Sequence, residues 1–388
     1  MNLLKELFLI FYIIIRSKKY YKVNKNIDLL VYNTEKNLFE NFLENNNFKY
    51  HYLNSNLNKI NILIFIKTLF KFFFLNIKFR SLYVIEYIKV YQPKLVITFS
   101  DNNLEFYKFK KYIPNIKFSF VQNGLRASSF DVFEKFENNE VYEVDYMFVF
   151  NESIGKEYNK YIKGKYFVVG SLKNNFVEIL EHKTEKSIVY ISQYTSEDSL
   201  DDIMLDSQIN GKVTFREFYK HERIILPYIK DFCKENDFNF KIIGRPSTKF
   251  KIKKEKQYYD SILKDFDWIY IKSEKSYDSY KLINQNALII TACCTMGVES
   301  LSRDKKIIFF PVRSKKISDV FGWPVKFEEE GFFWCTDNSK ENFNKLINNV
   351  INININDWKK IIKPYKQKLM LYDHNNYKFK KIISDILV

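Results

Sequence analysis

Residues 287–310 read ALIITACCTMGVESLSRDKKIIFF, and they are the most informative stretch of the sequence. Its two apolar runs, 287–290 and 307–310, are typical of parallel strands that are covered on both faces. Between them, residues 291–297 have small side chains, and we expect a short helix to begin near Thr295. The unpaired amides and the positive dipole end of such a helix favour an anion, so the stretch predicts a phosphate site beyond the first strand.

Met296, Gly297 and Glu299 belong to the start of this expected helix, with Glu299 in its first turn. A carboxylate in the first turn stabilises a helix by roughly 0.3–1 kcal/mol, so stability alone could explain it. A contact from Glu299 to a ribose is the more specific interpretation.

The same alternation of short apolar runs and longer helical patterns extends along the chain. It predicts an α/β fold with parallel sheets, and because the pattern is written twice it predicts two Rossmann-like domains. The expected strands cover residues 28–32, 48–53, 95–99, 118–122, 146–150 and 166–169 in the first half, and 187–192, 238–243, 268–271, 287–290 and 307–310 in the second. A long helix is expected over 215–235.

The polar, charged segment 178–186 marks the expected junction between the domains. We therefore expect an N-terminal domain over 1–180, a C-terminal domain over 181–365, and a helix over 366–388 that packs back on the first domain. The tail reads as helices interrupted by Pro364. Ligands of open α/β sheets lie at the carboxyl ends of the strands, so two such sheets facing each other would enclose the site in a cleft.

The composition is that of a folded protein that meets an acidic partner. The 388 residues include 38 Phe and 28 Tyr, and the formal net charge is +16. Such a charge suits nucleic acid, anionic lipid or a phosphorylated substrate. The basic residues are scattered in short runs, which favours solvated faces over a nucleic-acid patch.

Cysteine and histidine usage indicates a reducing cytoplasm and no zinc site. The cysteines at 233, 293, 294 and 335 lack C-x-x-C spacing, and the four histidines are widely dispersed.

Two apolar stretches bear on membranes. Residues 7–15 fall short of the ~20 that a spanning helix needs, and no small-residue cleavage site follows them. Residues 60–79 mix lysines with aromatic and aliphatic side chains. Such a helix could lie in an anionic membrane interface or be buried in the first domain, and the sequence leaves both open.

Polar residues follow the strands 95–99 and 118–122. Asp101 is suited to act as a base for an acceptor hydroxyl or as an anion facing a cationic sugar, and its alternative role is to cap a helix over 104–112. Gly124 would permit a turn with positive φ, while Asn123 and Arg126 could contact a sugar or a carboxylate. Turn chemistry alone is the alternative for this second group.

Further polar residues follow strands of the second half. Ser192 and Gln193 follow the strand 187–192, and Arg245 follows 238–243, where its guanidinium could pair with phosphate. Gly170, Ser171 and Asn174 approach the cleft from the junction, or form a linker turn. Asp265 and Asp267 have the D-x-D spacing of a metal site but precede their strand, so we expect a turn there and a metal-independent reaction.

Three motifs, taken together, resemble a bacterial family of surface carbohydrate biosynthesis proteins. They are QNGLR at 122–126, GSLKNN at 170–175 and TMGVESL at 295–301, and the closing GFFW at 331–334 adds to them. The family is similar to the Kdo transferases of capsule and lipopolysaccharide and, more remotely, to CDP-glycerol glycerophosphotransferases. The resemblance covers residues 29–334. This chain departs from it at 292–295, where relatives have Ser-Thr, and at Asn123, where the related enzymes have histidine.

The resemblance implies a GT-B glycosyltransferase, with the acceptor on the first domain and the activated sugar on the second. The implied donor is a CMP-linked, Kdo-like or other ulosonic acid, and the implied acceptor is a lipopolysaccharide, capsule or other surface glycan. No cofactor besides this nucleotide-sugar co-substrate is implied. The implied location is cytoplasmic, with peripheral contact to anionic lipid at the inner face of the membrane and no contact to nucleic acid.

The roles of individual residues follow from this implied reaction. The catalytic candidates are Asp101, Asn123 and Arg126. Thr295 and Arg245 would stabilise the leaving phosphate and Glu299 would hold the ribose. The other donor-binding candidates are Gly170, Ser171, Asn174, Ser192, Gln193, Met296 and Gly297.

Three other functions remain open from the sequence. The same architecture and anion site would serve polyol-phosphate transfer from a CDP-alcohol. The positive charge and the aromatic residues would suit a nucleic-acid-binding protein, although that function leaves the 287–310 unit without a purpose. The third is a sensor that binds a nucleotide sugar and has no turnover.

Overall fold

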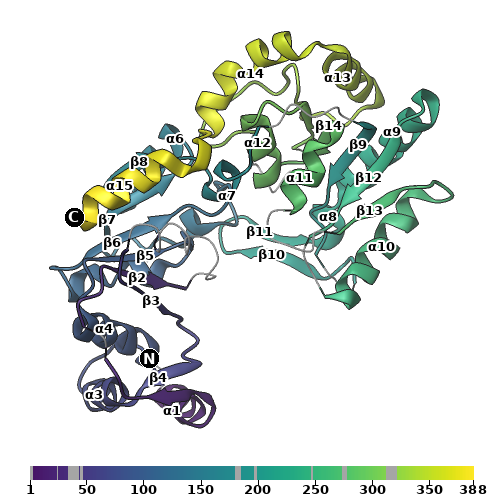
Figure 1. Ribbon diagram of the computed structural model, residues 1–388. Coiled ribbons are helices and arrows are strands. Elements are labelled where there is room, and N and C mark those ends of the chain that lie inside the picture. The colour runs from purple at the N-terminus through teal and green to yellow at the C-terminus, as the bar shows by residue number, and fades with distance from the viewer. Residues whose placement is uncertain are drawn as a thin grey trace.

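Two parallel β-sheets form the framework of the protein in the computed structural model, which confirms the α/β fold (Figure 1). The structure describes residues 3–23, 25–33, 43, 47–179, 185–195, 199–245, 248–272, 278–311 and 321–388. The predicted junction near residue 181 lies outside the described residues.

The first sheet has six parallel strands in the order β3-β2-β5-β6-β7-β8. Its central strands β2 and β5 are buried along their whole length, which is why their sequences are continuously apolar. The strands are β2 (Leu29–Tyr32), β3 (Tyr50–Leu53), β5 (Leu95–Thr98), β6 (Lys117–Val121), β7 (Tyr142–Val149) and β8 (Ile162–Val168). The helices of this part are α1 (Leu3–Arg16), α3 (Ile62–Phe72), α4 (Phe79–Tyr91), α5 (Leu104–Tyr107), α6 (Glu152–Asn159) and α7 (Leu172–Asn175).

The second sheet has five parallel strands in the order β13-β12-β9-β14-β15. They are β9 (Glu185–Ile191), β12 (Asn239–Ile243), β13 (Ile269–Ile271), β14 (Asn286–Thr291) and β15 (Ile307–Phe309). Helices α9 (Lys220–Asn236), α10 (Lys249–Leu263), α11 (Asp278–Asn284) and α12 (Thr295–Ser302) connect or flank them, and α13 (Lys340–Asn352) and α14 (Ile355–Leu369) follow β15.

The C-terminal helix α15 (Tyr377–Leu387) packs on the first sheet (Figure 1). Its buried residues Phe379, Ile383 and Leu387 belong to the same apolar cluster as Leu29 and Ile97 of that sheet. Pro364 lies inside α14, so the expected interruption of the tail at this residue is wrong.

Every strand predicted from the apolar runs is present, with ends shifted by up to four residues. The long helix expected over 215–235 is divided into α8 (Phe215–Phe218) and α9, because Thr214 caps α8 in a capping box and the chain turns at Tyr219. Two small two-stranded sheets were not predicted. They are the hairpin of β10 (Ile203–Ser207) with β11 (Gly211–Thr214), and the parallel pair of β1 (Lys18–Tyr20) with β4 (Lys59–Asn61).

Candidate functional site

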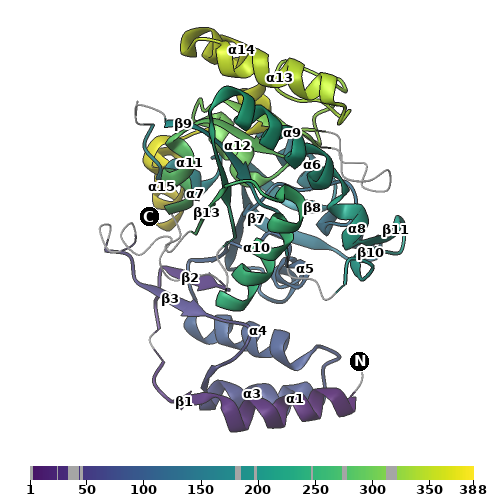
Figure 2. The ribbon, with the colours of Figure 1, turned by 90° about the vertical axis from the view of Figure 1, so that its right-hand side faces the viewer.

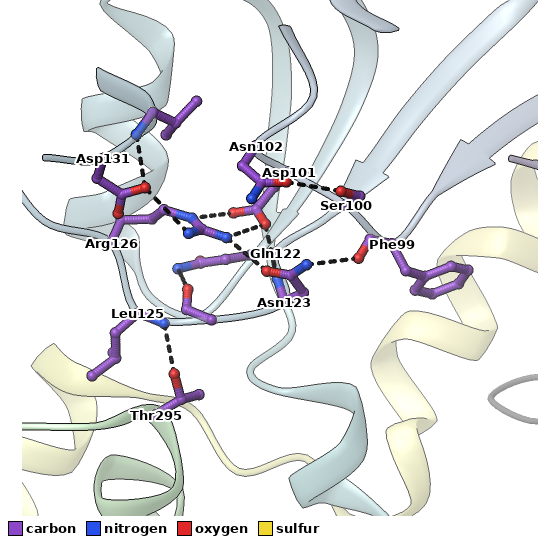
Figure 3. Close-up of polar contacts among 12 residues, drawn as sticks. Phe99, Ser100, Asp101, Asn102, Gln122, Asn123, Leu125, Arg126, Asp131 and Thr295 are labelled. Atoms are coloured by element: carbon purple, nitrogen blue, oxygen red, sulfur yellow. Dashed lines mark hydrogen bonds and ion pairs between the residues drawn. The ribbon is translucent and has the colours of Figure 1, made fainter. Parts of the chain in front are cut away.

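The carboxyl edges of the two sheets meet at a seam formed by the loops after β6 and β14. The Leu125 amide, beyond β6, donates a hydrogen bond of 2.9 Å to Thr295 Oγ1, beyond β14 (Figure 3). On the second sheet, Gln193 Nε2 donates to the carbonyl of Cys293 at 2.7 Å, which joins the loops after β9 and β14. The start of α12 therefore faces the first domain across this seam.

Helix α12 begins at Thr295, as the sequence predicts, and Cys294 is its N-cap. The Cys294 Sγ accepts a bond of 3.3 Å from the Gly297 amide. The preceding amides, of Thr295 and Met296, have no acceptor among the residues that the structure describes. Both residues are half-buried, and amides at the positive end of a helix dipole have the character of an anion site.

Gly297 has a packing function in the structure. A Cβ atom at this position would lie 2.8 Å from Thr291 Cγ2 and 2.9 Å from Phe309 Cε1. The glycine therefore lets α12 lie directly on β14 and β15, and its amide is already used by Cys294.

Asp101 is the centre of a buried polar cluster in the first domain (Figure 3). Its Oδ1 accepts from Arg126 Nη2 at 2.5 Å and from the Asn123 amide at 3.2 Å. Its Oδ2 accepts from Arg126 Nε at 2.7 Å and from the Tyr158 hydroxyl at 2.5 Å. A carboxylate offers about four acceptor positions, so Asp101 would have to give up a partner before it could take a proton from a substrate.

Arg126 keeps its positive charge and Tyr158 keeps its proton in this cluster. Burial disfavours the charged form of Arg126, but the attraction of Asp101 outweighs burial and raises the pKa of the guanidinium. Burial and the neighbouring Asp101 raise the pKa of Tyr158 well above its ordinary value, so its hydroxyl remains a donor. Sequence reasoning missed Tyr158, which belongs to α6 and is distant from the motifs.

Arg126 also organises the loop after β6. Its Nη2 donates to Asn123 Oδ1 at 2.6 Å, and its Nη1 lies 3.4 Å from Asp131 Oδ1. Two expectations about this region are wrong. Asp101 does not cap a helix, because α5 is preceded by Asn103, which makes no capping bond. Gly124 does not have a positive φ, and a Cβ atom there would lie at an ordinary contact distance of 3.4 Å from Thr295 Oγ1.

The segment from Gly170 to Asn174 joins the first domain to α12 by buried contacts. Gly170 has a φ of 71°, and a Cβ atom there would meet the carbonyl of Leu371. Ser171 caps α7, and Asn174 Nδ2 donates to Ser302 Oγ at 2.8 Å. The side chains of Ser171 and Asn174 are thus engaged within the protein at the domain junction.

Glu299 lies in the second turn of α12, so its expected place in the first turn is wrong. Ser171 Oγ donates to its Oε1 at 2.5 Å and Tyr280 donates to its Oε2 at 2.9 Å. Burial raises the pKa of Glu299 against the effect of these two donors. The nearby Arg303 is buried as well, and burial lowers its pKa despite the attraction of Glu299.

Ser192 lies beside a buried carboxylate that the sequence did not reveal. The Ser192 and Tyr270 hydroxyls both donate to Glu255 of α10, which burial gives a raised pKa. Glu255 thereby ties together the carboxyl ends of β9 and β13. In the sequence, Glu255 lies within the lysine-rich run 249–256. Such a run is typical of a solvated face and does not indicate a buried carboxylate.

Arg245 follows β12 and is exposed, at the same edge of the second sheet. Burial raises the pKa of Glu255, and the positive charge of the nearby Arg245 partly offsets this effect. Asp265 has a φ of 52° in the turn that follows α10 and precedes β13, at the amino end of that strand. Over the described part of the chain, no group of three or more His, Cys, Asp or Glu residues could hold a metal ion.

The fold is that of GT-B enzymes. The UDP-GlcNAc 2-epimerase of Methanocaldococcus jannaschii, in complex with UDP-GlcNAc and UDP, aligns with 92% of this chain and 99% of its own, at a TM-score of 0.53 and 15% identity. The wall teichoic acid polymerase TagF aligns with 94% of this chain and 90% of its own, at a TM-score of 0.52 and 11% identity. A glycosyltransferase of Rickettsia africae aligns with 94% of this chain and 99% of its own, at a TM-score of 0.50 and 13% identity. At these identities the likeness establishes the fold. No curated protein matches the chain.

Residues 119–386 match a family described as "putative O-antigen biosynthesis protein". This match spans most of the chain, and the protein belongs to that family. The expected relation to surface glycan biosynthesis is thereby confirmed at the level of the family.

Proposed function

We propose that the protein is a glycosyltransferase that moves a sugar from a nucleotide donor to a surface glycan acceptor. The observation that carries the proposal is the pair of amides at the start of α12, which face the first domain at the seam of a GT-B fold. Membership in an O-antigen biosynthesis family supports a glycan acceptor.

In this proposal the C-terminal domain holds the donor. The amides of Thr295 and Met296 bind a phosphate oxygen of the nucleotide, and Arg245 neutralises further negative charge from the end of β12. Both interactions strengthen as the glycosidic bond breaks and charge gathers on the leaving phosphate, which is the requirement for stabilising a transition state. The reaction on this account needs no metal ion.

The N-terminal domain holds the acceptor at the loop after β6. Asn123 and the ordered Arg126 loop are its candidate contacts. Since the four acceptor positions of Asp101 are filled, we assign Asp101 a positioning role that orders this loop. Glu299 accepts hydrogen bonds from Ser171 and Tyr280, and a ribose hydroxyl could bind this carboxylate only by replacing one of them.

The finer identity of the donor rests on the sequence resemblance, which favours a CMP-linked ulosonic acid over a CDP-alcohol. The test is a calorimetric panel of CMP, CDP, UDP and GDP, followed by donor hydrolysis with CMP-sugar, CDP-glycerol and UDP-GlcNAc. A nucleotide present at a hundred times its dissociation constant should stabilise the protein by about 2.7 kcal/mol.

We expect CMP to stabilise the protein more than UDP or GDP. Stronger stabilisation by CDP, with turnover of CDP-glycerol, would assign the protein to polyol-phosphate transfer. Epimerisation of UDP-GlcNAc without an acceptor, or binding of no nucleotide at all, would contradict the glycosyltransferase proposal.

A further inference from the structure

Helices α1 and α3 form a separate layer at one end of the molecule. They lie side by side beneath α4, at the opposite end from α13 and α14 (Figure 2). The parallel pairing of β1 with β4 ties the end of α1 to the start of α3. Glu6 of α1 also accepts a 3.0 Å bond from the Phe79 amide, which opens α4. We call this layer the basal helix pair.

Each helix of the basal pair is apolar on its inner and on its outer side. The inner side chains, such as Ile10 and Ile13 of α1 and Phe65 of α3, are buried in the main core. The outer side chains include Phe8, 67% exposed, and Phe70, 69% exposed. The exposed apolar residues of the layer are Leu3, Leu4, Leu7, Phe8, Phe11, Tyr12, Ile14, Ile15, Leu63, Ile66, Phe70, Phe73, Phe74 and Leu75. Exposed apolar side chains recur along both of these neighbouring helices, and large exposed apolar areas mark interaction sites.

The charges around the basal helix pair are almost all positive. Exposed basic residues flank its apolar side chains, namely Lys5, Arg16, Lys18, Lys19, Lys22, Lys78 and Arg80. The acidic residues Glu6 of α1 and Glu86 of the adjacent α4 are engaged within the protein. Glu6 binds the start of α4, and Glu86 lies between Lys67 at 3.0 Å and Lys71 at 2.7 Å. The surface thus combines apolar side chains with a rim that attracts anions.

We propose that the basal helix pair docks on the surface of a bilayer that contains anionic lipid, with both helix axes in the plane of the membrane. A 14-residue helix is about 21 Å long, which is shorter than the ~30 Å hydrocarbon core. No helix in the described part of the chain is long and apolar enough to cross a membrane. A helix that lies in the membrane interface places its apolar side chains at the boundary between headgroups and acyl chains and its lysines at the headgroups.

The charge also argues against a second copy of the chain as the occupant. Two copies joined through this face would bring their basic rims together, which is unfavourable. Anionic headgroups neutralise the same rim. This inference does not depend on the donor or on the reaction, so its test and the nucleotide panel fail independently.

The experiment is sedimentation of the full chain with vesicles of phosphatidylcholine, with or without phosphatidylglycerol. The test variant combines Phe70→Asp and Phe74→Asp, and the matched control is Phe250→Asp on α10, whose side chain is 65% exposed far along the chain. Because all three phenylalanines are exposed, folding should survive, and the unfolding temperature checks this.

We expect the wild type and the control to bind vesicles with phosphatidylglycerol, less so at high salt. The double variant should bind at least tenfold more weakly, since two large apolar groups no longer enter the lipid. A charge variant, Lys18→Glu with Lys19→Glu, should lose the preference for phosphatidylglycerol. Absence of vesicle binding by the wild type, equal binding by the double variant, or a dimer in solution that the double variant abolishes would overturn the proposal.

Discussion

At the scale of single residues, Asp101 decides how the candidate site is interpreted. A carboxylate after a parallel strand is a natural candidate for a catalytic base. Here it is fully buried, and its acceptor positions are filled by Arg126, Tyr158 and the Asn123 amide. The contacts describe a residue that orders the loop after β6.

Asp101→Asn should therefore destabilise the protein, because it leaves the guanidinium of Arg126 buried without its main counter-charge. We expect a loss of about 3–5 kcal/mol in the free energy of unfolding, measured by urea denaturation. The matched control is Asp131→Asn, which removes a longer, partly exposed contact to Arg126 of 3.4 Å and should cost much less. If Asp101→Asn unfolded like the wild type, bound donor normally and lost only turnover, the residue would be a base and our assignment would be wrong.

At the scale of elements, the placement of α12 on the second sheet is the feature on which the proposed donor site depends. Gly297 makes this placement possible, since any larger residue would collide with Thr291 and Phe309. The start of the helix contacts the loop after β6 through Thr295.

Gly297→Ala should force α12 away from β14 and β15. Overpacking of this kind costs about 1–3 kcal/mol in the free energy of unfolding, and nucleotide affinity should fall with it. Gly124→Ala is the control, because its new methyl group would meet Thr295 Oγ1 at an ordinary 3.4 Å. Denaturation curves and calorimetry of both variants give the comparison, and equal stability of the two would contradict this function of Gly297.

The elements also show why some features could be predicted from the sequence. The buried strands were predictable because continuous apolar runs have few other uses in a soluble α/β protein. The hairpin of β10 and β11 was missed although Asn210 and Gly211 are a hairpin signal, because only its Val213 is buried and the pattern is mostly polar.

The candidate site was predictable only in part. The loops after β5 and β6 come together because the carboxyl ends of parallel strands share one edge of the first sheet. The loop after β14 belongs to the second sheet and meets them through the contact of Thr295 with Leu125. Glu255 and Tyr158 could not be anticipated, since their place in the site results from packing between distant helices and strands. The side chains of Ser171, Asn174 and Glu299 are committed to contacts within the protein, which no motif reveals.

At the scale of the whole molecule, α12 connects the two domains. Its start contacts the loop after β6 through Thr295, and its later turns contact the domain junction through Glu299 and Ser302. A ligand at the start of α12 would therefore bind to a helix that contacts both domains. The basal helix pair lies in the first domain, on which the proposal places the acceptor.

Binding of a donor phosphate at the start of α12 is tested by comparing Thr295→Pro with Thr295→Val in calorimetric titrations of the nucleotide that stabilises the wild type most. Both variants lose the contact to Leu125, and only proline also removes the amide. Proline is tolerated at the first position of a helix, and Cys294 already has the extended conformation that a following proline requires.

A hydrogen bond to a charged group contributes about 1.5–3 kcal/mol, which corresponds to a tenfold or larger change in affinity. We expect Thr295→Pro to bind the nucleotide at least tenfold more weakly than Thr295→Val, with both variants folded. Equal affinities of the two variants would contradict the claim that the start of α12 binds the donor phosphate.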